Sequence, residues 1–191
     1  VSTGGVVGGA VMVLFALGGI LIGTLAARTG LAVRSVFGAS ALGLAIHPFT
    51  DLLTGEPPDL FAPWAVTPLA GRIEPFADGV LNLALAFGTE LAVIWFGLLV
   101  GLTAVGIEPR RQVHLGAMLG VVYAPMAFVL DAPSVDNAMP FVATILPMGF
   151  AGVLSPKRSW TSAGVLTVVL TGLAAITVAL LAFVVSYVTL A

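Results

Sequence analysis

The stretch SAGVLTVVLTGLAAITVALLAFVVSYVTL, residues 162–190, decides the fold class of this chain. It contains no charged side chain. An α-helix of this length exceeds the roughly 30 Å of hydrocarbon in a bilayer. The stretch therefore predicts a helix that crosses a membrane.

Similar apolar runs recur along the rest of the chain, separated by charged breaks or breaks rich in proline and glycine. They cover residues 5–27, 35–53, 80–106, 115–130 and 138–154. The last two are short and contain Pro125 and Pro147, so we expect each to be kinked, or the pair to form a tight or partly re-entrant hairpin. Together the runs predict an all-α fold, a polytopic transmembrane helix bundle of about six spans that forms one domain over residues 1–191.

The composition supports this interpretation. The chain is 59% hydrophobic and 8% charged, with a mean hydropathy of +1.15, whereas soluble domains carry about a quarter charged residues. Its net charge of -2 and its lack of basic clusters argue against nucleic-acid binding. Because the chain has no cysteine, disulfides and thiolate metal sites are excluded. The partner that the composition predicts is the lipid bilayer.

The positions of lysine and arginine predict the orientation, because these residues are retained in cytoplasmic loops. With the exception of Arg72, they fall in alternate breaks between the apolar runs. These residues are Arg28, Arg34, Arg110, Arg111, Lys157 and Arg158. We therefore expect a multi-pass protein of the cell membrane with both termini outside.

The stretch AIHPFTDLLTGEPPDLFAPW, residues 45–64, holds the first candidate site residues. His47 and Asp51 are four residues apart, so on a continuous helix they share a face and could bind one metal ion. Pro48 favours a helix that restarts there, with His47 at its mouth and Asp51 in its first turn. Either geometry places the pair near the outer surface, where polar groups inside a span are functional candidates.

Glu90 is the second candidate, inside the run 80–106. It lies about 15 Å below the outer end of that run, and His47 lies about 9 Å below the same surface. Adjacent helices could therefore bring the two side chains into one polar pocket. A structural role is the competing interpretation, in which a protonated Glu90 joins helices by hydrogen bonds. The other histidine, His114, is expected at the inner face, in solvent or among lipid phosphates.

Residues 47–64 resemble the membrane-bound metal-dependent hydrolase family, described as LexA-binding, inner-membrane-associated hydrolases. That family ends a membrane helix with His-x-x-x-Asp, then Leu-Leu-Thr, a glycine and a Pro-Trp or Pro-Phe pair. The matching residues here are His47, Asp51, Leu52, Leu53, Thr54, Gly55, Pro63 and Trp64. The resemblance implies hydrolysis in which a divalent metal, zinc-like, lowers the pKa of a bound water. His47 and Asp51 would bind the metal, and Asp51 and Glu90 would act as catalytic carboxylates.

The chain departs from the family in its first residues. The family carries a Thr-His near the start, a Pro-Asp-x-Asp segment and a His-Arg-x-x-Thr-His-Ser motif, and none occurs here. Catalytic zinc usually takes three protein ligands and a water, so this chain offers an incomplete set and could be inactive even though the family it resembles is an enzyme family. Since it begins at Val1, about one helix before His47, we expect an N-terminally truncated product whose upstream reading frame encodes the missing histidines.

Two other functions fit the same residues. The chain could be a small transporter or permease component, with Glu90 and His47 as an ion relay and the proline-containing runs as gating breaks. It could instead be a membrane scaffold. In that case small residues such as Gly116 and Gly120 would let helices approach closely, in a homo-oligomer or with a membrane partner.

Overall fold

The computed structural model describes Leu53 and residues 71–154 and 162–190. The chain divides into two compact units, Val1–Ile73 and Glu74–Ala191, and almost all described residues belong to the second, the C-terminal unit. The described residues form helices and no strands, which confirms the all-α class. The predicted runs 5–27 and 35–53, apart from Leu53, lie outside the described residues, and the single domain stays a prediction.

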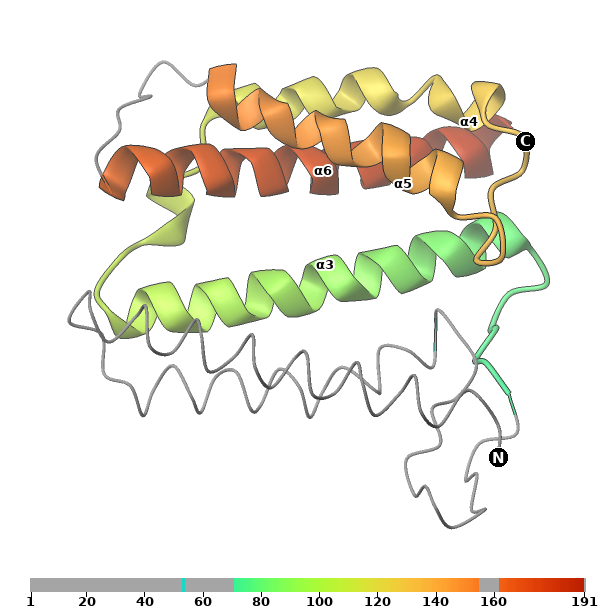
Figure 1. The fold of residues 1–191 in the computed structure, drawn as a ribbon, viewed down its shortest axis with the longest axis horizontal. Helices are drawn as coiled ribbons and strands as arrows, with labels where there is room; N and C mark the ends of the chain where they lie inside the picture. The colour runs from blue at the N-terminus through green and yellow to red at the C-terminus, as the bar shows by residue number, and fades with distance from the viewer. Residues whose placement is uncertain (1–52, 54–70, 155–161, 191) are drawn as a thin grey trace, which may run out of the picture. The chain divides into compact units, whose positions relative to one another are not determined.

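Two long helices form the frame of the C-terminal unit (Figure 1). They are α3, Gly79–Ala104, and α6, Ser162–Leu190. The carboxylate of Asp78 caps α3, because its Oδ1 accepts the N–H groups of Val80 at 2.8 Å and Leu81 at 3.1 Å. Gly106, with φ of 77°, follows the other end of α3 and allows the chain to turn away. Both helices match predicted runs, and both are long and apolar enough to cross a membrane.

The two shorter apolar runs form helices that change type along their length. The run 115–130 forms η2, Leu115–Tyr123, and then α4, Met126–Val129. The run 138–154 forms α5, Met139–Ile145, and then η3, Leu146–Leu154. Both η segments have 3₁₀ winding over 9 residues, although such runs rarely exceed three or four.

Each change of helix type occurs at a proline. Pro125 is the N-cap of α4, and Pro147 is the second residue of η3. Proline lacks the N–H that an α-helix needs at an interior position. The predicted interruption of both runs is therefore confirmed.

Helix α6 is central in the unit because η2 and η3 both pack along it (Figure 1). Glycines permit this packing. A Cβ added at Gly120 of η2 would overlap the carbonyl oxygen of Ala175, and one at Gly152 of η3 would overlap that of Val168. The backbones are thus nearly in contact, which confirms that Gly120 permits a close helix approach, here within one chain. Its approach to a partner stays a prediction.

The residues of α3 that are buried in the core lie in its first half. Leu83 and Leu91 join a core around Phe141 and Phe183, whose rings meet edge to face at 5.2 Å. From Ala92 to Thr103, no residue of α3 is buried. The exposed second half of α3 therefore forms one side of a groove at that end of the unit.

Candidate functional site

The structure describes only part of the site that the sequence predicts. His47 and Asp51 lie outside the described residues. Glu90 lies near the middle of α3, and its side chain is exposed. Within residues 71–154 and 162–190, no three histidine or acidic side chains lie close enough together to hold a metal ion. The predicted metal site at His47 and Asp51 stays a prediction.

Asp78 lies at the end of the C-terminal unit where α3 begins and α6 ends (Figure 1). Besides capping α3, it accepts a hydrogen bond of 2.7 Å at Oδ2 from the hydroxyl of Tyr187. This bond is the main cause that lowers the pKa of Asp78 below its ordinary value of 3.8. The two backbone N–H groups act in the same direction, and burial opposes them. All three bonds join protein groups, so Asp78 connects two helices and has a structural role.

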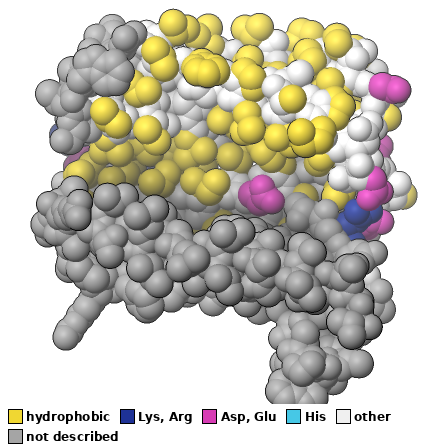
Figure 2. Space-filling model, viewed as in Figure 1, with side chains coloured by type: hydrophobic (Ala, Val, Ile, Leu, Met, Phe, Trp, Pro, Cys, Tyr) yellow, Lys and Arg dark blue, Asp and Glu magenta, His cyan; other side chains and the backbone are white. Residues whose placement is uncertain are grey.

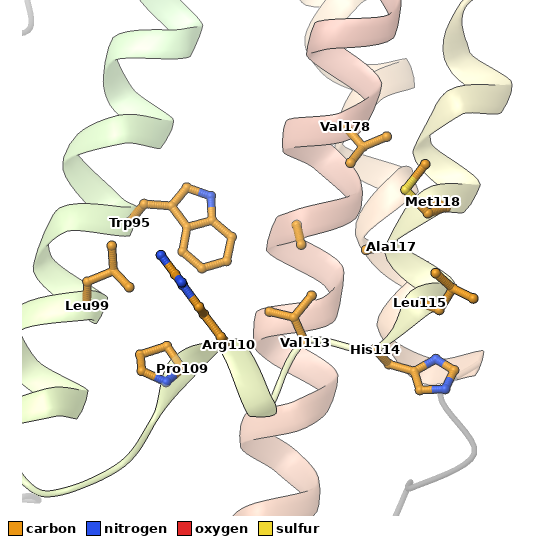
Figure 3. A pocket seen from close by; sticks show the side chains of 11 residues that line it. Trp95, Leu99, Pro109, Arg110, Val113, His114, Leu115, Ala117, Met118 and Val178 are labelled. Carbon is orange, nitrogen blue, oxygen red and sulfur yellow. The ribbon is translucent and has the colours of Figure 1, made fainter.

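The groove lies toward the opposite end of the unit and has a volume of about 530 Å³. Helix α3 contributes Trp95 and Leu99 to its walls, and α6 contributes Ala174 and Val178 (Figure 3). The segment from Pro109 to Met118 contributes most of the rest. Pockets of 300–1,000 Å³ with mostly apolar walls are typical of small-molecule sites.

Arg110 is the charged residue that the groove contains. It belongs to η1, Pro109–Arg111, and its side chain extends toward the ring of Trp95 (Figure 3). The neighbouring Arg111 forms a salt bridge with Glu108. Among the described residues, no carboxylate pairs with Arg110. The groove therefore combines apolar walls with one cation that lacks a counter-ion in the described part of the protein.

Hydrogen bonds hold the segment between η1 and η2 to α6. The backbone N–H of His114 donates to Thr171 Oγ1 at 3.0 Å, and Thr167 Oγ1 donates to Gln112 Oε1 at 3.0 Å. The Nδ1 atom of His114 accepts the N–H of Gly116 at 3.0 Å. His114 is thus half-buried and caps η2, whereas the sequence predicted it in solvent or among lipid phosphates.

Comparison of the chain with protein-family models, curated proteins and solved structures finds no match. The class of protein is therefore inferred from the helices of the chain itself. The described part is all-helical, with two helices of the length and hydropathy needed to cross a membrane. On the face that Figure 2 draws, hydrophobic side chains spread over the described part of the protein, with few acidic ones among them.

Proposed function

We propose that the chain is a multi-pass protein of the cell membrane with about six spans. The observation that supports this most is the surface of α3. Its membrane-length stretch has a mean hydropathy of 2.1, yet only 22% of that stretch is buried. A helix that is this apolar and remains this exposed is suited to lipid rather than to water.

The 3₁₀ winding supports spans at the two shorter helices. A 3₁₀ helix rises about 2.0 Å per residue, against about 1.5 Å in an α-helix. With their 3₁₀ segments, Leu115–Val129 and Met139–Leu154 reach about 27 Å and 28 Å. Both lengths approach the roughly 30 Å of bilayer hydrocarbon. The winding compensates for the small number of residues.

The distribution of charge supports the orientation. Arg110 and Arg111 follow the last turn of α3, whereas Asp78 precedes its first turn. Asp131 and Asp136 lie in the connection between α4 and α5. Since arginine marks cytoplasmic loops, the Arg110 end would be cytoplasmic and both chain termini would lie outside.

Within this membrane protein we propose an outward-facing site of metal-dependent hydrolysis. The supporting observation is the order His47, Asp51, Leu52-Leu53-Thr54 and Gly55 at the end of an apolar run. His47 and Asp51 would bind a divalent, zinc-like metal, and Asp51 and Glu90 would be the catalytic carboxylates. Ionisable groups inside an apolar span such as α3 are functional candidates.

Metal content tests this proposal, and the chain's two histidines provide a matched pair. We expect the purified protein to carry a divalent metal, and we expect His47→Ala to remove most of it. His114→Ala should retain the metal, because His114 caps η2. A metal-free protein, or equal metal content in the two variants, would contradict the site.

A further inference from the structure

The groove between α3 and α6 has the chemistry of a site for an anionic amphiphile. Its walls include Leu99, Leu115 and Met118, whose side chains remain 42%, 79% and 54% exposed. The polar atom of Trp95 is already used, because its Nε1–H donates to Thr177 Oγ1 at 2.9 Å. These walls offer an apolar chain many contacts but offer a sugar or a base few hydrogen bonds.

Arg110 supplies the complementary charge at one end of this groove. Its guanidinium carries several N–H donors suited to phosphate oxygens. Arg111, its neighbour in η1, is already paired with Glu108. Arg110 has no such partner among the described residues, so an anionic ligand would neutralise a cation that now faces apolar walls.

The position of Arg110 along the chain selects the kind of amphiphile. It lies between the end of α3 at Ala104 and the start of η2 at Leu115, which is the level of lipid headgroups if both helices cross the membrane. Trp95 lies about 14 Å from the Ala104 end of α3 along the helix, and the side chain of Arg110 extends back toward its ring (Figure 3). The groove therefore runs from headgroup level into the hydrocarbon, and basic pockets between spans on the cytoplasmic side bind anionic lipid headgroups.

We infer that this groove binds an anionic phospholipid of the cytoplasmic leaflet, with its phosphate on Arg110 and one acyl chain along Trp95 and Leu99. The inference rests on the proposed membrane location and is independent of the metal site. It assigns different functions to the two ends of the C-terminal unit: a structural connection at Asp78 and a lipid site at Arg110.

Native mass spectrometry of the full-length protein tests the phosphate contact. Phosphatidylglycerol and phosphatidylcholine with identical acyl chains serve as probes. We expect the protein to prefer phosphatidylglycerol, and Arg110→Gln to reduce that preference by about fivefold or more. Arg111→Gln is the matched control and should retain the preference. Equal losses in the two variants, or no preference in the unmodified protein, would overturn the inference.

Two further arms test the acyl chain and the source of the anion. Leu99→Trp should fill the groove and weaken the binding of both lipids, whereas Val100→Trp, on an exposed position of α3 outside the groove, should not. Millimolar inorganic phosphate should leave the lipid bound. Displacement by phosphate, or equal effects of the two tryptophans, would overturn the lipid assignment. A metal-free protein that keeps the lipid preference would contradict only the hydrolase.

Discussion

Asp78 illustrates how one carboxylate stabilises several neighbours. Its Oδ1 caps α3 through Val80 and Leu81, and its Oδ2 accepts the hydroxyl of Tyr187 in the last turn of α6. Each bond favours the charged carboxylate, so its pKa is lower in the folded protein than in the unfolded chain. The unfolded chain therefore binds the proton more readily. The contribution of Asp78 to stability increases with pH between the lowered pKa and the ordinary value of 3.8.

Asp78→Asn tests this contribution. Asparagine keeps a side-chain oxygen for the cap but loses the charge. We expect the unmodified protein to lose stability as the pH falls below the ordinary value of 3.8 toward the lowered pKa, and we expect Asp78→Asn to lose less over that range. Melting temperatures in detergent as a function of pH measure the difference. Asp78→Ala should also cost about 0.5–2 kcal/mol near neutral pH through the lost cap.

Tyr187→Phe removes the same hydrogen bond from the other side. It should leave the cap intact and bring the pKa of Asp78 closer to its ordinary value, so the acid loss becomes smaller. An unchanged pH dependence in both variants would show that other carboxylates cause the acid response.

The sequence predicted some of the candidate residues but not their partners. His47, Asp51 and Glu90 could be selected because polar groups in apolar runs are rare. Arg110 served only to predict orientation, since it and Arg111 lie side by side near Glu108, and only the fold shows which of them is paired. The threonines of α6 were the sequence signal for its contact with His114. In the structure Thr171 is completely buried, and its Oγ1 accepts a hydrogen bond from the backbone N–H of His114.

At the scale of elements, hydropathy located the helices but not their winding. The runs 80–106 and 162–190 correspond to α3 and α6 within a few residues, because length and apolarity alone define such helices. The 3₁₀ winding of η2 and η3 could not be predicted. In an almost wholly apolar run, periods of 3.0 and 3.6 residues give the same pattern.

Close backbone packing of η2 on α6 leads to a prediction with a matched control. Gly120→Ala would place a methyl group on the carbonyl oxygen of Ala175, so we expect a loss of about 1–3 kcal/mol of stability. Gly101→Ala in α3 makes the same chemical change where no atom lies within 4 Å, and it should be neutral or stabilising by up to about 1 kcal/mol. Unfolding in mixed micelles measures both. Equal effects would contradict the close approach.

At the scale of the whole molecule, the account depends on whether the short helices cross the membrane. The described residues contain two helices of full membrane length, α3 and α6. Whether Leu115–Val129 and Met139–Leu154 also cross depends on the 3₁₀ winding of η2 and η3. The orientation depends on Arg110 and Arg111. The scaffold and transporter alternatives require the same membrane location, so they do not affect this question.

The most direct test uses the absence of cysteine from the chain. Two variants, Glu108→Cys and Asn137→Cys, each place a single cysteine on one side of Leu115–Val129. A membrane-impermeant maleimide then reports which cysteine faces outward. We predict that Asn137→Cys reacts in intact cells and that Glu108→Cys reacts only after permeabilisation. Reaction of both cysteines from the same side would show that Leu115–Val129 does not cross, and would contradict the account.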